Sequence, residues 1–176
     1  VDPHLHRRAS LDEVYSIPAE NVASAPAIAR WVAAHVPEPV IVGPDSESEQ
    51  WASDVAARVG CPFIVLSKRR LGDRSVEISV PKVEAHAGRR PVLIDDIISS
   101  ARTMAVAVRQ VRSVFKNDPV CIGVHAVFAL DAMQLLEDAG AASVVTCNTL
   151  PHPSNGIDVM GDVAQAVRAR VGSVSG

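Results

Sequence analysis

Two adjacent carboxylates, followed by small and hydroxyl-bearing residues, form the part of this sequence best equipped for chemistry. Asp95 and Asp96 come directly after the apolar residues 92–94, and a short loop follows before a helical pattern begins. Carboxylates accept hydrogen bonds from a vicinal diol and also bind Mg²⁺. The five residues that complete the loop are Ser99, Ser100, Ala101, Arg102 and Thr103.

This loop suits a phosphate group. The loop and the helix start after it offer unpaired backbone N–H groups and the positive end of a helix dipole. Ser99, Ser100 and Thr103 add hydroxyl donors, and Arg102 adds positive charge. Together with the acid pair, the pattern predicts a site for a phosphorylated ribose.

Three other interpretations of the acid pair compete with this one. Two acids after a strand occur in Walker B sites, but the sequence contains no G-x-x-x-x-G-K-[ST] motif. The pair can also cap a helix, where the dipole favours acids, or bind a metal without any sugar. The pattern alone leaves the last two interpretations open.

The elements that position these residues alternate between strands and helices. Such alternation predicts an α/β fold with a doubly wound, mostly parallel sheet, in which ligands bind at the carboxyl ends of the strands. No repeat or linker divides the chain, so we expect residues 1–176 to form one domain. Strands are expected at residues 40–43, 62–66, 91–95, within 120–130 and at 142–146, and helices at 26–36, about 47–59, 101–115, 132–139 and 161–171.

Two segments between these elements have patterns of their own. Residues 68–74 are charged and contain a glycine, which predicts a mobile loop. Residues 75–83 alternate between apolar and polar types, which predicts a short edge hairpin or ribbon. Taken alone, Lys68-Arg69-Arg70 is typical of a solvated basic turn.

The composition bears on the class of protein. Hydrophobic residues make up 48% of the chain and only six residues are aromatic, as is typical of α/β domains packed through small aliphatic side chains. The net charge of −3 gives no support for a nucleic-acid partner, and no apolar run reaches the length of a membrane span. The scattered cysteines Cys61, Cys121 and Cys147 favour buried thiols in a reducing, cytoplasmic setting.

The acid pair and its loop resemble a known motif. An aliphatic strand, Asp-Asp and a small or hydroxyl loop ending in Thr resemble the phosphoribosyl pyrophosphate (PRPP) binding motif of type I phosphoribosyltransferases and PRPP synthetases. Further segments resemble synthetase motifs in the same order and extend the resemblance over essentially the whole chain. These segments are Val1-Asp2-Pro3-His4, Gly43-Pro44-Asp45, residues 68–70 with 76–78, residues 125–128 and residues 144–151.

The resemblance to ribose-phosphate pyrophosphokinases, as PRPP synthetases are also called, implies a type I phosphoribosyltransferase-like fold and an enzyme. Such an enzyme transfers the diphosphate of ATP to C1 of ribose 5-phosphate and gives PRPP and AMP. The resemblance implies Mg²⁺ as cofactor, ATP and ribose 5-phosphate as substrates, and a homo-oligomer of dimers assembled into larger rings.

The same resemblance implies roles for individual residues. Asp95, with Asp96 beside it, would hold the ribose, and residues 99–103 would cradle the 5-phosphate. Lys68 and Arg70 would close over the ATP phosphates and stabilise charge in the transition state.

His4 and Asp45 would be the Mg²⁺-associated pair of such a site. Each has a plainer interpretation, because His4 lies near a terminus and Asp45, which precedes a helix, can simply cap it. His125, which belongs to a late strand motif, is by itself more often a core histidine than a ligand.

The chain departs from this family in its loop and in its length. The typical synthetase loop has Asp, Thr and Gly where this chain has Ser99, Ser100 and Arg102, and a glycine permits close backbone approach and positive φ. The synthetases have two similar α/β domains, and this chain, which begins at Val1 and not at Met, resembles only the second. We therefore expect a fragment, lacking the N-terminal half, that binds ribose 5-phosphate weakly and makes little PRPP unaided. A non-catalytic regulatory or binding protein and a phosphoribosyltransferase are the alternative functions.

Overall fold

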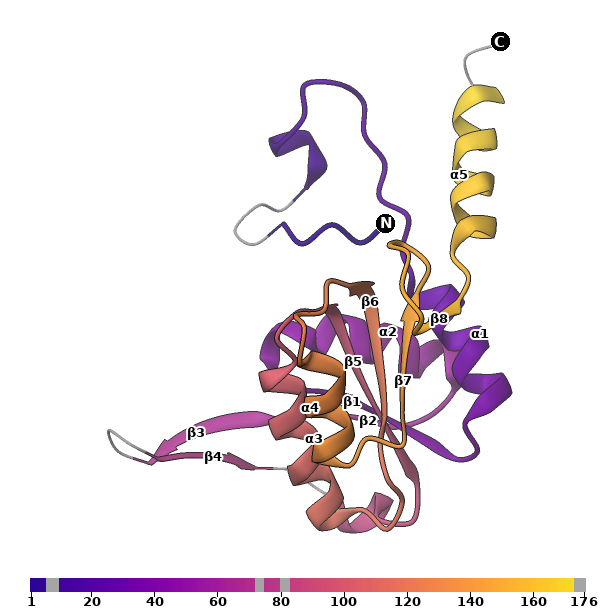
Figure 1. Ribbon diagram of the computed structural model, residues 1–176. Coiled ribbons are helices and arrows are strands. Elements are labelled where there is room, and N and C mark those ends of the chain that lie inside the picture. The colour runs from indigo at the N-terminus through magenta and orange to yellow at the C-terminus, as the bar shows by residue number, and fades with distance from the viewer. Residues whose placement is uncertain (6–9, 72–74, 80–82, 173–176) are drawn as a thin grey trace.

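Six parallel strands make up the central sheet of the computed structural model, in the order β2-β1-β5-β6-β7-β8 (Figure 1). The structure describes residues 1–5, 10–71, 75–79 and 83–172, without the side chains of residues 67–71, 75–79 and 83–84. The predicted α/β class and parallel sheet are confirmed, whereas β8 has too few residues to show a period and was not predicted. The strands are β1 (Pro39–Gly43), β2 (Phe63–Val65), β5 (Arg90–Ile98), β6 (Val120–Ala126), β7 (Ser143–Cys147) and β8 (Asn155–Ile157).

Helices cover both faces of this sheet, as a doubly wound fold requires. Helices α1 (Ala25–His35) and α2 (Glu49–Val59) pack on one face, and α3 (Arg102–Val114) and α4 (Ala132–Ala139) pack on the other. The last helix, α5 (Met160–Gly172), projects away from the sheet and contributes no buried residue. Across the described residues, no helix combines the length and the apolar character needed to span a membrane. The 3₁₀ turns are η1 (Leu11–Glu13), η2 (Ser46–Ser48) and η3 (Val83–His86).

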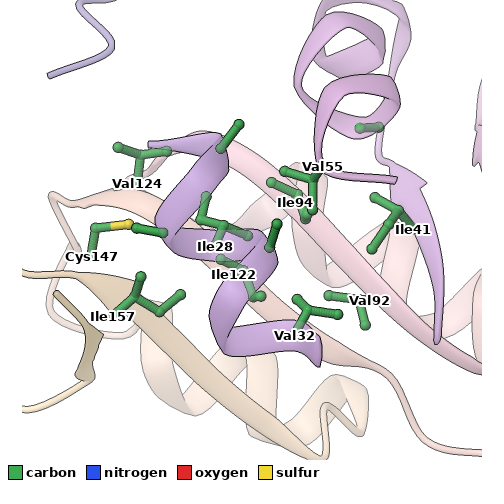
Figure 2. Packing of buried hydrophobic residues seen from close by; sticks show 14 of the residues in the cluster. Ile28, Val32, Ile41, Val55, Val92, Ile94, Ile122, Val124, Cys147 and Ile157 are labelled. Carbon is green, nitrogen blue, oxygen red and sulfur yellow. The ribbon is translucent and has the colours of Figure 1, made fainter. Parts of the chain in front are cut away.

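Alternation along the strands divides the apolar side chains between two cores. Ile41 of β1 and Ile94 of β5 pack with α1 and α2, whereas Val40 and Leu93, one position earlier in each strand, pack with α3 and α4. Figure 2 shows the first core, where Ile28 of α1 lies over the sheet. Since successive side chains of a strand point to opposite faces, strands covered on both faces have the continuous apolar runs seen in the sequence.

The chain changes its winding direction between β1 and β5. Helix α2 leads from β1 to β2 on one side, and the chain then returns to place β5 on the other side of β1. The carboxyl ends of β1 and β5 therefore meet at the topological switch point of the sheet. Ligands of open α/β sheets bind in the crevice at such a point.

A two-stranded antiparallel arm takes the place of the predicted loop. Strand β3 (Ser67–Leu71) pairs with β4 (Ser75–Ser79), so that Lys68 lies opposite Ile78. The expectation of a mobile loop is wrong for residues 68–71, because β4 pairs with their backbone, and residues 72–74 lie outside the described residues. The predicted hairpin is confirmed for residues 75–79, while residues 80–82 again lie outside the described part of the chain.

Strand β5 carries the acid pair, so its packing must be intact for the site to form. Replacement of the fully buried Ile94 by Ala is expected to lower the free energy of unfolding by about 2–5 kcal/mol, because it removes buried methyl groups and leaves a cavity. Urea denaturation checks this. Val106→Ala, on the exposed face of α3, is the control and should change the free energy by less than about 0.5 kcal/mol. Equal effects of the two substitutions would contradict this description of the core.

Candidate functional site

The loop after β5 lines a small cavity at the switch point. The cavity has a volume of about 190 Å³ and is lined by Asp95 and residues 97–104. Ser99, Ser100, Arg102 and Thr103 are exposed, and their side chains form no hydrogen bond or ion pair with another described residue. The loop that the sequence singles out is therefore open to a ligand.

The backbone of this loop turns at Ala101, whose φ is +57°. Arg102 is already the first residue of α3, and its φ is not positive. The expectation that position 102 needs a glycine for a positive φ is therefore wrong, because the residue with the left-handed backbone is Ala101, one position earlier. An alanine gives no sequence signal for this conformation, which residues other than Gly, Asn and Asp rarely adopt.

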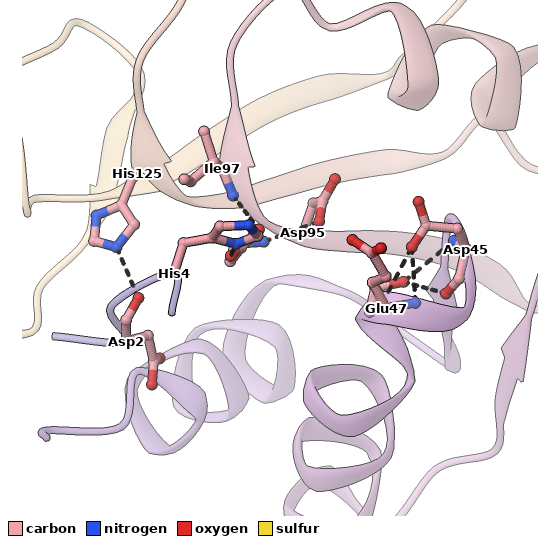
Figure 3. A network of polar contacts seen from close by, with 9 residues as sticks. Asp2, His4, Asp45, Glu47, Asp95, Ile97 and His125 are labelled. Carbon is pink, nitrogen blue, oxygen red and sulfur yellow. Dashed lines mark hydrogen bonds and ion pairs between the residues drawn. The ribbon is translucent and has the colours of Figure 1, made fainter. Parts of the chain in front are cut away.

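The N-terminal segment crosses the carboxyl edge of the sheet and brings His4 to the acid pair. The Nδ1 atom of His4 pairs with Oδ2 of Asp96, 92 positions away in the sequence (Figure 3). The second carboxylate oxygen of Asp96 accepts a hydrogen bond of 2.8 Å from the backbone N–H of Ile97. The structure thus brings His4 to Asp96, a contact that the sequence motifs do not predict, while the association of His4 with Mg²⁺ stays a prediction.

Asp2 fixes this segment in place. Its carboxylate accepts a 2.7 Å hydrogen bond from the backbone N–H of Ser24, at the start of α1. Its carbonyl oxygen lies 3.1 Å from Nε2 of His125, and the other nitrogen of His125 lies 2.9 Å from Oγ1 of Thr149. His125 on β6 therefore secures the segment that carries His4, a role that its position in an apolar strand does not reveal.

Asp45 follows β1 and caps the turn η2. Its side chain accepts hydrogen bonds from the backbone N–H groups of Glu47 (3.0 Å) and Ser48 (3.3 Å), and the Ser48 hydroxyl in turn faces the backbone N–H of Asp45. The capping interpretation of Asp45 is thus confirmed. The hydrogen bonds from Glu47 and Ser48 both end on Oδ1 of Asp45, so that Oδ2 remains available to a ligand. Within the described residues, no group of three or more His, Cys, Asp or Glu side chains is placed to hold a metal ion by itself.

The crowding of carboxylates at this edge changes the acidity of Asp95. Burial, together with the negative charges of Asp96 and Asp45, raises the pKa of Asp95 from its ordinary value of 3.8 to about 7. Loss of hydration and nearby like charges both disfavour the ionised carboxylate. Asp95 is therefore close to half-protonated near neutral pH, and its carboxyl can both donate and accept hydrogen bonds.

Lys68 and Arg70 lie on the arm and not in a turn. Strand β3 begins directly after Leu66, whose backbone N–H bonds to the carbonyl of Gly43 at the end of β1. The arm thus starts at the same edge as the cavity. The side chains of Lys68 and Arg70 are not among those that the structure describes, so their contact with phosphates stays a prediction.

The fold and this edge together define an open α/β domain with an acid pair and an exposed, hydroxyl-bearing loop at its switch point. The chain belongs to the phosphoribosyl transferase domain family, whose model matches residues 10–162. This assignment places the loop of residues 99–103 and the acid pair within the matched region.

Curated relatives show which members of this family the chain is similar to. The ribose-phosphate pyrophosphokinase of Methanopyrus kandleri is 30% identical over 165 residues, which cover 93% of this chain and 56% of the relative. The enzyme of the same name from Methanobrevibacter smithii is 29% identical, with coverage of 94% and 59%. The predicted resemblance to ribose-phosphate pyrophosphokinases is confirmed, and the chain spans somewhat more than half the length of these relatives.

Solved structures confirm the predicted type I phosphoribosyltransferase-like fold. The phosphoribosylpyrophosphate synthetase of Mycobacterium smegmatis superposes with a TM-score of 0.78 at 24% identity, covering 94% of this chain and 56% of that one. An adenine phosphoribosyl transferase from Trypanosoma brucei gives a TM-score of 0.54 at 19% identity, with coverage of 77% and 69%. At these identities the similarity concerns the fold alone.

The raised pKa of Asp95 predicts a dependence of stability on pH. Between pH 3.8 and about 7 the folded protein retains a proton that the unfolded chain has released, so the contribution of Asp95 to the free energy of unfolding falls as the pH rises through this window. Asp95→Asn removes this contribution. The free energy of unfolding of the variant, relative to that of the wild type, should therefore increase from pH 4 to 7 and stay at the higher value above pH 7. Urea denaturation at several pH values measures the difference, and a difference independent of pH would contradict the assignment.

Proposed function

We propose that this chain forms the sugar-phosphate-binding part of a ribose-phosphate pyrophosphokinase. The observation that carries the proposal is the open loop of residues 99–103, which lies beside Asp95 in a cavity at the switch point of the sheet. The names of the curated relatives support this reaction. The T. brucei enzyme of the same fold was solved with ribose 5-phosphate, which supports the ligand class.

Each part of ribose 5-phosphate has a partner in this arrangement. The 5-phosphate accepts hydrogen bonds from the backbone N–H groups and hydroxyls of residues 99–103, at the positive end of α3. Arg102 adds a charge that no described acid neutralises. The carboxyl of Asp95, which lines the same cavity, bonds to the ribose hydroxyls.

The proposed reaction is a diphosphoryl transfer. The 1-hydroxyl oxygen of the sugar forms a bond to the β-phosphorus of ATP, the bond between that phosphorus and the oxygen bridging to the α-phosphorus breaks, and AMP leaves with the electron pair. The hydroxyl proton is lost in the same process. Lys68 and Arg70 would stabilise the charge that develops on the phosphate oxygens.

The oxygen and nitrogen ligands available at this edge fit a magnesium ion whose coordination shell is completed by substrate phosphates. Mg²⁺ in nucleotide sites commonly takes one or two protein carboxylates together with substrate phosphates and water. Asp45, with one carboxylate oxygen outside the cap, would be its protein ligand, with His4 nearby on the same edge. When bound, the ion would neutralise phosphate charge.

An assay of products separates this proposal from its alternatives. Ribose 5-phosphate and Mg-ATP are incubated with the chain alone and together with the half of the M. kandleri relative that the chain does not match. We expect AMP and PRPP to form in the mixture of halves and very little with the chain alone. Lys68→Ala should abolish turnover and leave ribose 5-phosphate binding intact. Pyrophosphate release from PRPP with adenine would instead identify a phosphoribosyltransferase. Binding of ribose 5-phosphate without turnover, both by the chain alone and in the mixture of halves, would favour a regulatory protein.

Arg102 offers a test of phosphate binding that does not depend on turnover. Loss of a charge-assisted hydrogen bond costs about 1.5–3 kcal/mol, so Arg102→Ala should weaken ribose 5-phosphate binding by roughly 10- to 100-fold in titration calorimetry. Arg109→Ala is the matched control, because Arg109 is an exposed arginine on the same helix, away from the cavity. Equal affinities of the two variants would contradict the placement of the phosphate.

A further inference from the structure

The N-terminal segment that carries His4 is held at Asp2, whose backbone has an unfavourable conformation. Asp2 has a φ of +30°, in a range that residues with a side chain rarely adopt. Such a conformation persists only where the surrounding contacts enforce it. The backbone N–H of Asp2 bonds to the carbonyl of Val22 (3.2 Å), and its carboxylate accepts the 2.7 Å bond from Ser24. Both bonds lead to the stretch before α1, whereas a third bond, from His125, ties Asp2 to strand β6 of the sheet (Figure 3).

The partners of His125 determine which of its ring nitrogens carries a hydrogen. Nε2 lies 3.1 Å from the carbonyl oxygen of Asp2, which can only accept a hydrogen bond, so Nε2 must be the donor. Nδ1 lies 2.9 Å from Oγ1 of Thr149, which is also 2.9 Å from the carbonyl oxygen of Val124. In the neutral ring, Nδ1 accepts the hydroxyl hydrogen of Thr149, and in the charged ring it donates to the hydroxyl, whose hydrogen then bonds to Val124. In both states Nε2 donates to Asp2.

We propose that His125 and Thr149 are positioning residues that hold the N-terminal segment, and with it His4, at the carboxyl edge of the sheet. The role rests on the proposed function, because it concerns the same site. Thr149, which follows β7, fixes the orientation of the His125 ring, and the ring in turn fixes Asp2, two positions before His4. These three residues do not line the cavity at the loop of residues 99–103. The pair therefore acts on the placement of His4 and not on the sugar phosphate.

Two substitutions separate the two hydrogen bonds of His125. The amide nitrogen of a glutamine side chain can reach the position of Nε2, so His125→Gln keeps a donor for the carbonyl of Asp2. An asparagine side chain is one carbon shorter and places its polar atoms near the position of Nδ1, so His125→Asn keeps only the contact with Thr149. His125→Asn should therefore release the N-terminal segment, whereas His125→Gln should largely retain it. A histidine that only filled space would not give this order, because both substitutions remove the ring.

Two measurements on the chain alone, without substrate, test this arrangement. Long-range ¹H–¹⁵N NMR, with the His125 signals assigned by their loss in His125→Gln, should show a hydrogen-bearing Nε2, and a bare Nε2 would overturn the proposal. The backbone N–H of Ser24, which bonds to Asp2, should exchange with solvent about tenfold faster in His125→Asn and less than about threefold faster in His125→Gln. Thr149→Val should also accelerate this exchange, whereas Thr149→Ser, which keeps the hydroxyl, should not. The buried N–H of Val108 on α3 is the control and should not change, and equal exchange of Ser24 in His125→Asn and His125→Gln would contradict the proposal.

Kinetics in the mixture of halves test the link to the reaction. His125→Asn should lower kcat by about tenfold or more, whereas the affinity of the chain alone for ribose 5-phosphate should change by less than about threefold in calorimetry. An unchanged kcat, or equal losses of kcat and affinity, would overturn the positioning role. Because the tautomer and the exchange are measured without substrate, they can have the expected form even if the mixture makes no PRPP. Failure of the proposed function and failure of this proposal can therefore be told apart.

Discussion

Parallel pairing of β1 with β5 is the constraint on which the site depends. The pairing brings the carboxyl ends of both strands to one edge, so Asp45 and the acid pair converge although 50 residues separate Asp45 from Asp95. Converging carboxylates repel one another, and burial removes the water that would screen them. The raised pKa of Asp95 is the direct result, and positive partners at this edge relieve the repulsion.

The protein supplies a hydrogen-bond partner for Asp96 from its own N-terminal segment. His4 reaches Asp96 because Asp2 is secured at both the start of α1 and the end of β6, where His125 in turn contacts Thr149. The loop of residues 99–103 supplies a positive region, through the dipole of α3 and the side chain of Arg102. An anionic sugar phosphate placed between the loop and Asp95 completes this balance of charge.

The sequence predicts what is local and periodic. Continuous apolar runs revealed the buried strands, helical spacing revealed α1 to α5, and the acid pair with its loop revealed the cavity. Strand β3 was missed because Lys68 and its neighbours are charged, and an arm paired outside the main sheet needs no apolar face. The His4–Asp96 pair and the role of His125 have no local signal, since they join residues more than 90 positions apart. The strained turn at Ala101 was hidden because an alanine at positive φ is rare.

Mapping of ribose 5-phosphate onto the backbone tests the central claim most directly. Amide ¹H–¹⁵N spectra of the labelled chain are recorded during a titration with ribose 5-phosphate, and with ribose as the control that lacks the phosphate. The account predicts that the largest shifts occur at residues 99–103 and at Asp95, and that ribose alone leaves the loop unshifted. The account would be contradicted if the largest shifts occurred elsewhere, such as at the separate cavity beside Trp51. It would also be contradicted if ribose shifted the loop signals as ribose 5-phosphate does.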